Sequence, residues 1–149
     1  MIVDTSFVLD VIDGLDAAVS KEKKLEAAGV PLVIPAMTVL ELYIGVGKVA
    51  STQQERQQVE AILDSYPLVE TTPSIARRAG RLLGERLADA ADGEEPGIGK
   101  GDATIAATAI ERDEPVLAGD AHFDTIPGVS VERIVDADSS SRVLVNTAA

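Results

Sequence analysis

Four acidic residues stand at positions where a carboxylate needs an explanation. Asp4 and Asp120 each end a short apolar run of strand type, and Asp102 opens an alanine-rich helical segment. Glu41 falls among apolar residues of another helical segment. Carboxylates gathered at one place repel one another, so such a cluster keeps its charge at neutral pH mainly when a cation lies in it. The spacing therefore predicts a metal site as one explanation of these acids.

The residue types limit the ion to a hard cation. The chain has no cysteine and one histidine, so a cluster of these acids offers oxygen ligands only. Oxygen ligands suit Mg²⁺ or Mn²⁺. Such ions polarise a phosphoryl oxygen and generate a hydroxide, which suits hydrolysis of a phosphodiester. The acids would then serve as metal ligands rather than as a general acid and base.

Taken singly, three of the acids have a structural alternative. Asp4 and Asp102 both fit the N-cap position of a helix, and Asp120 fits an ordinary turn after Gly119. Glu41 is harder to explain in this way. It lies four residues after Met37, on the apolar side of its helical segment, and has no basic residue four positions before or after it. A carboxylate buried there costs stability unless it is paired or coordinated.

Strand-like and helix-like segments alternate along the chain. The strand-like segments are residues 1–3, 30–34, 66–70, 116–118 and 129–132. The helical segments are residues 6–12, 15–28, 36–49, 51–65, 75–91 and 102–113. This order predicts a single three-layer α/β/α domain with a central parallel sheet. Ligands bind at the carboxyl ends of such strands, so Asp4 and Asp120 should meet at that edge, with Asp102 facing it.

Apolar spacing predicts which side of each helix is buried. Met37, Leu40 and Ile44 indicate an inward stripe in segment 36–49. The inward residues expected in segments 51–65 and 75–91 are Val59, Ile62, Leu63, Ala79, Leu82, Leu83 and Leu87. We expect residues 1–135 to form the domain and residues 136–149 to be a loosely ordered tail, of which 143–145 can dock.

The composition is that of a compact protein with an unusually negative net charge. It has 149 residues, 46% of them hydrophobic, and a net charge of -12. Such a charge argues against nucleic acid as a partner. However, only 5 of the 13 basic residues are lysine, which favours an acidic surface adapted to high salt, as in halophilic proteins. No segment reaches the ~20 apolar residues of a membrane span, and neither export signal nor cysteine is present, so we expect a cytoplasmic protein.

Four motifs in register resemble the PIN domain family, the nucleases that include the VapC-type toxins of toxin–antitoxin pairs. The resemblance covers residues 1 to about 131. Its motifs are IVDTSFVLDVIDG, TVLELYIGV, GDATIAATAIE and VLAGDAHFDTIPGVSV, which place Asp4, Glu41, Asp102 and Asp120 respectively. Each motif alone is weak, whereas the four in order are specific.

The resemblance implies a PIN-like fold and a metal-dependent endoribonuclease. Asp4, Glu41, Asp102 and Asp120 would bind one or two Mg²⁺ or Mn²⁺ ions and carry the catalysis. The hydroxyl of Thr5 or Ser6 would support the site. The implied partners are an RNA substrate, a second copy in a homodimer and a small cognate antitoxin, with no membrane.

The chain departs from the family pattern at one position, and some residues near the motifs have open roles. Ala118 stands where the family often has Thr or Ser. His122 is expected to be structural or on the surface, and Asp124 to point to solvent. Lys100 is a candidate phosphate contact, as is a basic helix face at Arg77, Arg78, Arg81 and Arg86, which would otherwise be a solvated face paired with Glu85 and Asp89.

Two other functions fit parts of the pattern. One is a catalytically silent, PIN-like RNA-binding module that keeps the four acids and lacks turnover. The other is a phosphatase with Asp4 as the nucleophile. That chemistry needs a second acid two residues later, where this chain has Ser6.

Overall fold

The structure is a computed structural model that describes residues 1–48, 52–91, 93–119, 121–134 and 143–145. Its strands are β1 (Ile2–Val3), β2 (Ile34–Pro35), β3 (Leu68–Val69), β4 (Val116–Ala118), β5 (Ser130–Arg133) and β6 (Val143–Val145). Its helices are α1 (Thr5–Ile12), α2 (Asp16–Ala27), α3 (Ala36–Lys48), α4 (Gln53–Ser65), α5 (Pro73–Asp89) and α6 (Lys100–Arg112).

The central sheet is parallel except at one edge. Its strand order is β1-β4-β5-β6, and β1, β4 and β5 run parallel. A second pair, β2 and β3, is also parallel and joins β1 through a bridge between Ile2 and Val33. β6 pairs antiparallel with β5, so residues 143–145 dock on the sheet. The predicted parallel α/β sheet is confirmed.

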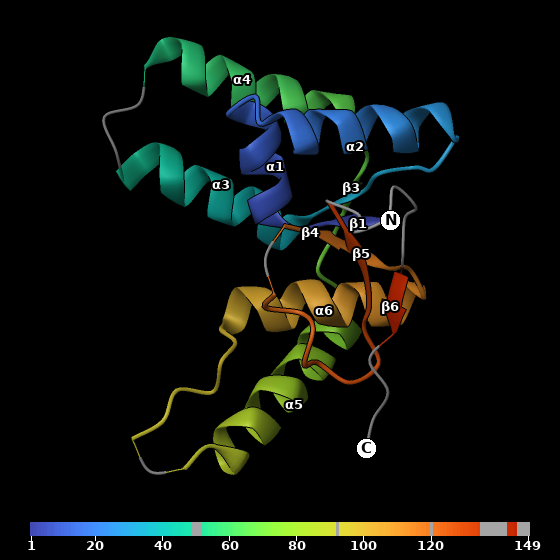
Figure 1. Ribbon diagram of the computed structural model, residues 1–149. Helices are drawn as coiled ribbons and strands as arrows, with labels where there is room; N and C mark the ends of the chain where they lie inside the picture. Colours follow the sequence, from blue (N-terminus) through green and yellow to red (C-terminus); the bar gives the residue numbers. More distant parts are fainter. Residues whose placement is uncertain (49–51, 92, 120, 135–142, 146–149) are drawn as a thin grey trace.

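Alternate residues of the strands face two separate cores. Ile2, Val116 and Ala118 pack into one apolar cluster together with residues of α5 and α6. Val3 and Leu117 pack into the other, with residues of α1, α2, α3 and α4. Side chains of a strand alternate between its two faces, so β1 and β4 each supply both cores. Figure 1 shows the resulting layers, with α1 to α4 on one side of the sheet and α5 and α6 on the other.

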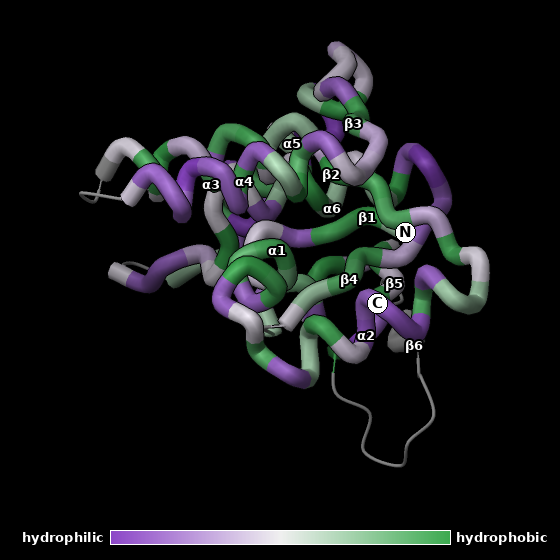
Figure 2. Tube along the Cα trace, turned by 90° about the horizontal axis from the view of Figure 1, so that it is seen from above, coloured by the Kyte–Doolittle hydropathy of each residue, from purple (hydrophilic) through white to green (hydrophobic). Residues whose placement is uncertain are grey.

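The hydropathy of the chain follows this layering. In Figure 2, β1 and β4 are hydrophobic and run between helices that carry many hydrophilic residues. Val59 is buried on α4, and Ile62 and Leu63 pack partly buried against the same core, as the apolar spacing predicts. Within the described residues, no helix is long and apolar enough to cross a membrane.

Three residues expected to face inward are exposed instead. Leu40 and Ile44 of α3 are 53% and 55% exposed, and Leu87 of α5 is 57% exposed. Among the described side chains of α3, Thr38 and Leu42 are buried. The Thr38 hydroxyl donates a 3.2 Å hydrogen bond to the carbonyl oxygen of Val3, and Leu42 packs into the core shared with α1, α2 and α4. Both contacts turn this face of α3 toward β1, which the apolar pattern alone did not reveal.

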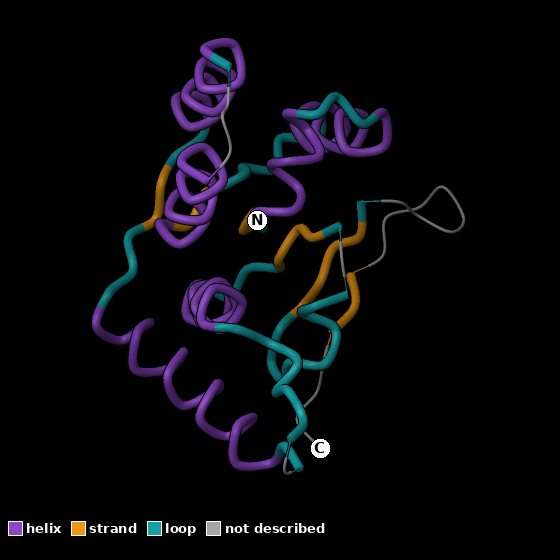
Figure 3. The backbone as a smooth tube through the Cα atoms, turned by 90° about the vertical axis from the view of Figure 1, so that its left-hand side faces the viewer, coloured by secondary structure: helices purple, strands orange, loops and turns teal. Residues whose placement is uncertain are grey.

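One ion pair crosses the interior. The Lys21 ammonium of α2 lies 2.7 Å from the Glu132 carboxylate of β5, and both side chains are 2% exposed. It joins α2 to the sheet. Figure 3 shows α2 above the strands, at the side of the sheet that carries β4 and β5.

Candidate active site

Asp4 lies at the junction between β1 and α1. Its N–H donates to the carbonyl oxygen of Leu117 at 3.0 Å, which fixes the end of β1 beside β4. The side chain is the N-cap of α1 and is buried, at 4% exposure. Its Oδ2 accepts a 2.6 Å hydrogen bond from the Ser6 hydroxyl and a longer one, 3.4 Å, from the Ser6 N–H. Asp4 therefore caps the helix and is also held at the carboxyl edge of the sheet.

Glu41 reaches the same junction from α3. Its Oε1 accepts a 2.8 Å hydrogen bond from the Thr5 hydroxyl. One turn earlier in α3, the contact between Thr38 and Val3 anchors the helix to β1. Glu41 is half-buried, so its carboxylate is satisfied by a hydroxyl donor while part of it stays accessible.

Gly101 makes room for the Glu41 carboxylate at the start of α6. A Cβ at position 101 would lie 2.8 Å from Glu41 Oε2, closer than real contacts allow, and 3.0 Å from its Cδ. The absence of a side chain at Gly101 lets the carboxylate approach the first turn of α6. Since Gly101 precedes Asp102, this contact brings Glu41 beside the third acid.

Asp102 lies in the first turn of α6 rather than at its cap. The helix begins at Lys100, and Gly99 is the N-cap residue, so the N-cap alternative for Asp102 is wrong. Its Oδ2 accepts a 3.3 Å hydrogen bond from the Gly99 N–H. Its Oδ1 lies 3.6 Å from Nδ1 of His122, whose side chain is 57% exposed. A carboxylate in the first turn is also favoured by the helix dipole.

Asp120 lies outside the described residues, but its neighbours are placed. The N–H of Gly119 donates to the Ser6 hydroxyl at 3.4 Å, which links the end of β4 to the residue that binds Asp4. After position 120, Phe123 and Ile126 are buried in the core. Arg86 of α5 donates to the carbonyl oxygen of Thr125. The segment that follows Asp120 is thus attached to the body of the protein.

Asp124 does not point to solvent, so that expectation is wrong. It pairs with the Arg133 guanidinium of β5, and both side chains are 28% exposed. The pair closes the loop back onto the strand that follows it, which turns the carboxylate inward. Asp124 thereby helps to hold the segment that carries His122.

The basic residues of α5 are partly used within the fold. Arg78 pairs with Glu111 of α6 at 2.9 Å, and not with Glu85 or Asp89. Hydrogen bonds from Arg78 and then Ser74 hold the pKa of the Glu111 carboxyl below its usual value. Because Arg86 contacts Thr125, two of the four expected arginines connect α5 to its neighbours. Lys100 is exposed at the start of α6.

Asp10 is a further acid at this edge, and no motif in the sequence predicted its place there. A Cβ at Gly119 would lie 3.1 Å from Asp10 Oδ2 and 3.8 Å from Ser6 Oγ. Ser6 and Asp10 are four residues apart on α1 and share a face of the helix. The sequence spacing of Ser6 and Asp10 could have indicated that they lie together. That this face of α1 meets the end of β4 is shown only by the position of Gly119.

The side chains at this edge are of the types that coordinate a divalent cation through oxygen atoms. The candidate ligands are carboxylate oxygens, which Mg²⁺ and Mn²⁺ prefer. Hydroxyl groups hold these carboxylates in place. The Glu41 carboxylate lies against Gly101, where an added Cβ would displace it from this position. In the part of the chain that the structure describes, no three His, Cys, Asp or Glu side chains form a group that would hold a metal ion.

Comparison with known proteins gives a family and a set of similar folds. The PIN domain family model matches residues 1–129. A comparison with curated protein sequences gave no match. The structure of VapBC2 from Rickettsia felis, bound to a fragment of promoter DNA, is similar with a TM-score of 0.75 and 21% identity; the match covers 89% of this chain and 96% of that one.

Two structures from Mycobacterium tuberculosis are also similar. VapBC-5, a member of the VapBC family of toxin–antitoxin systems, has a TM-score of 0.58 and 28% identity, with 91% and 97% of the two chains covered. VapC20, a toxin that cleaves the sarcin-ricin loop, has a TM-score of 0.59 and 19% identity, with 83% and 92% covered. The family match over most of the chain agrees with the sheet and the order of the motifs, and the chain belongs to the PIN domain family.

Proposed function

We propose that this protein is a metal-dependent endoribonuclease and the toxin of a type II toxin–antitoxin pair. Its catalytic carboxylates are Asp4, Glu41, Asp102 and Asp120, which bind Mg²⁺ or Mn²⁺. The observation that carries this proposal is the contact of Glu41 with both Thr5 and Gly101, because it joins α1, α3 and α6 at the edge where Asp4 also ends β1.

The bound cation would polarise a phosphoryl oxygen of the RNA and activate the attacking water. The chain's own residues hold the carboxylates in place. Ser6 orients Asp4, and Thr5 orients Glu41, so neither side chain needs to be ordered when substrate arrives. With a net charge of -12, the protein repels RNA, and cations at the site reduce that repulsion locally.

The proposed partners are a cognate antitoxin and a second copy of the chain. The antitoxin proposal is supported by the toxin–antitoxin complexes among the similar structures. The exposed side chains of Leu40, Tyr43 and Ile44 form an apolar surface on α3 that would be covered in either assembly. We place the nuclease in residues 1–135, followed by a tail of residues 136–149 from which β6 adds a strand to the sheet, and its action in the cytoplasm.

The test is cleavage of an end-labelled RNA by the purified protein. Cleavage should stop on chelation of divalent metal and return with Mg²⁺ or Mn²⁺. Asp4→Asn and Asp102→Asn should each abolish it while circular dichroism shows a folded chain. Asp13→Asn, an exposed residue at the end of α1, is the matched control and should cleave normally.

Two outcomes would overturn the proposal. Undiminished cleavage by both variants would contradict the role of these carboxylates. Mn²⁺ binding without cleavage of any RNA would instead favour the catalytically silent module. The phosphatase alternative has less support, because Ser6 donates a hydrogen bond to Asp4 at the position where that chemistry needs an acid.

A further inference from the structure

Lys100 carries a positive charge at the edge of the candidate active site. It is the first residue of α6, next to Gly101, which contacts the Glu41 carboxylate, and two residues before Asp102. Its carbonyl oxygen accepts a 2.7 Å hydrogen bond from the Thr104 hydroxyl, so its backbone is held in the first turn of the helix. The side chain is exposed, and its long flexible stem lets the ammonium move over the surface beside the acids.

The fold does not use the Lys100 ammonium. Among the residues that the structure describes, this ammonium forms no ion pair and no hydrogen bond. Acids are abundant in this chain, with 25 acidic residues against 13 basic ones, and Asp102 lies in the same helical turn. A lysine that served to neutralise the acids of the site would pair with one of them. The ammonium is therefore available to a ligand.

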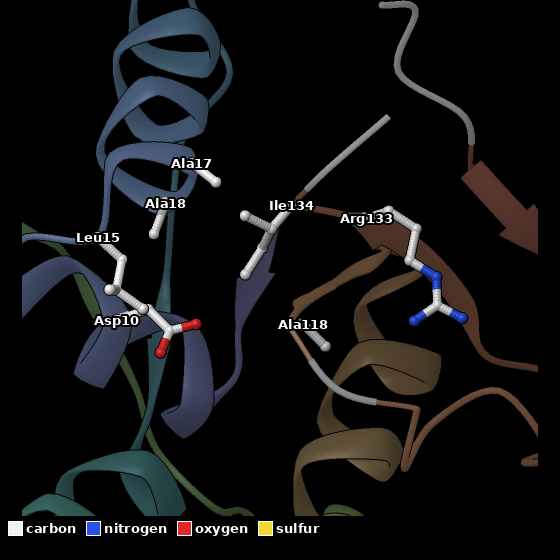
Figure 4. Close-up of a pocket in the computed structure, with 8 residues that line it drawn as sticks. Asp10, Leu15, Ala17, Ala18, Ala118, Arg133 and Ile134 are labelled. Atoms are coloured by element: carbon white, nitrogen blue, oxygen red, sulfur yellow. The ribbon is translucent and has the colours of Figure 1, made fainter. Parts of the chain in front are cut away.

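Two other basic side chains near this edge are held by the fold. Arg133 lines a cavity of about 310 Å³ at the ends of β4 and β5 (Figure 4), and its guanidinium pairs with Asp124. Arg86 of α5 donates to the carbonyl oxygen of Thr125, in the loop that follows β4. Of these three bases, Lys100 is the one without an acceptor in the described part of the chain.

The surface beside Lys100 is open at Gly99, the N-cap residue of α6. Gly99 has a φ of -105°, which any residue adopts, and an added Cβ would meet nothing within 4 Å. Serine, threonine, aspartate or asparagine would cap the helix at least as well. Neither the backbone nor the packing therefore requires glycine here. A position without a side chain does allow a ligand to approach the backbone closely.

A lone ammonium at this place suits a phosphate group. The net charge of -12 repels RNA, so a local positive charge is needed where the strand meets the protein. Lysine binds phosphate as a point charge. The ammonium would also repel a divalent cation, so Lys100 lies outside the set of metal ligands. Because it does not pair with the acids, the phosphate that it meets is a neighbour of the one held at them.

We propose that Lys100 binds a phosphate of the RNA strand next to the phosphate that is cleaved. It is a substrate-binding residue that holds the strand and takes no part in the reaction. The inference rests on the proposed function and adds to it a contact with the sugar–phosphate backbone. Such a contact positions the strand and carries no base preference.

The test compares Lys100→Gln with the wild type on single-stranded RNA. Glutamine removes the charge and keeps a flexible polar side chain. At low salt, KM should rise about fivefold, as expected for one exposed ion pair, with kcat unchanged. RNA binding in EDTA, measured by fluorescence anisotropy, should weaken by the same factor for RNAs of different sequence. The plot of log Kd against log salt concentration should become shallower by about 0.7, the contribution of one phosphate contact in a single strand.

Lys23→Gln is the matched control, because it changes the net charge equally at an exposed position of α2, outside the candidate active site. It should keep the KM and the salt dependence of the wild type. Lys100→Arg retains the positive charge and should recover most of the RNA affinity. Mn²⁺ affinity, measured by calorimetry, should be equal in Lys100→Gln and wild type. Thermal melting of all variants reports whether they remain folded.

The outcomes separate this inference from the proposed function. If the wild type neither binds nor cleaves RNA, both fail. If the wild type cleaves RNA and Lys100→Gln matches it in KM and in salt dependence, only the Lys100 contact is overturned. An equal effect of Lys23→Gln would assign the change to net charge and overturn the contact as well. So would a fall in kcat at unchanged KM, which would place Lys100 at the cleaved phosphate. RNA binding that depends on Lys100, without cleavage, would support the contact and overturn the nuclease.

Discussion

The Thr5 hydroxyl and the Glu41 carboxylate form a 2.8 Å hydrogen bond across 36 residues of sequence. Thr5 immediately follows Asp4, so this hydrogen bond holds the Glu41 carboxylate next to the position of Asp4. The bond also offsets the free-energy penalty of placing a carboxylate on an apolar helix, because Glu41 accepts a hydrogen bond instead of remaining unpaired. The bond therefore has a structural role and places a charge at the sheet edge at the same time.

Thr5→Val should test the placement of the charge. Valine keeps the shape of threonine and removes the donor, so the Glu41 carboxylate loses its orientation. We expect RNA cleavage to fall by about tenfold or more and Mn²⁺ affinity, measured by calorimetry, to fall with it, while stability drops by about 1 kcal/mol. Thr5→Ser restores a hydroxyl and should recover most of both. Equal cleavage by Thr5→Val and wild type would exclude a role for this bond.

Gly101→Ala should separate function from stability. The added Cβ would meet the Glu41 carboxylate at 2.8 Å and push it away from Thr5. Alanine is the better helix former, so the helix itself should not suffer. We expect cleavage and Mn²⁺ binding to fall while the melting temperature stays within a few degrees of wild type.

The matched control for that variant is Gly84→Ala in α5. Nothing lies within 4 Å of a Cβ at this position. It should therefore leave cleavage intact and raise stability by about 0.5 to 1 kcal/mol, the usual gain from replacing a helical glycine. Loss of cleavage in both variants would mean that the Gly101 effect is not specific to Glu41.

Local patterns in the sequence were enough to predict the sheet and the position of each helix. β1 and β4 are short and buried on both faces, so each appears as an apolar run bounded by a turn or an acid, as at Asp4. Helix rotation was less predictable. Thr38 faces inward with a hydrogen bond to Val3 and Leu42 with apolar contacts in the core, whereas Leu40 and Ile44 form the more apolar stripe and remain exposed.

The candidate acids were recognisable from the sequence, but the contacts between them were not. Asp4, Glu41 and Asp102 stand out by residue type and by position relative to strands and helices. The links through Thr5, Ser6, Gly101 and Gly119 join segments that are distant in sequence, and no local pattern reports them. Asp10 was missed for the same reason, since its importance depends on the approach of β4.

Alkaline pH should destabilise the protein in part through Tyr66. Burial and then the hydrogen bond from its hydroxyl to Glu22 raise the pKa of Tyr66 above its ordinary value of 10.0. The folded state thus keeps the proton that the unfolded state loses. This contribution to stability is complete below pH 10 and is lost as the pH rises from there towards the folded-state pKa.

The measurement is urea unfolding of wild type and Tyr66→Phe between pH 8 and pH 11. Phenylalanine has no proton to lose, so the fall in stability above pH 10 should be smaller in the variant. Tyr43→Phe, at a tyrosine that is 45% exposed, is the control and should follow the wild-type curve. Parallel curves for wild type and Tyr66→Phe across this range would contradict the prediction.

The buried ion pair between Lys21 and Glu132 gives the largest predicted effect on stability. Its atoms are 2.7 Å apart and both side chains are 2% exposed, so neither charge has access to bulk water. Lys21→Met leaves the Glu132 carboxylate buried without that partner, and we expect a loss of about 3 to 5 kcal/mol in the free energy of unfolding. This is a large part of the ~5 to 15 kcal/mol that stabilises a typical domain.

The double variant Lys21→Met with Glu132→Leu should recover most of that loss. Two apolar side chains of similar size remove both charges, and replacing a buried ion pair in this way is often neutral. Urea unfolding of the wild type, both single variants and the double variant gives the coupling free energy of the pair. Lys23→Met and Lys24→Met, at exposed positions of α2, are controls that should change stability little. A loss below about 1 kcal/mol for Lys21→Met would show that water or another group compensates Glu132.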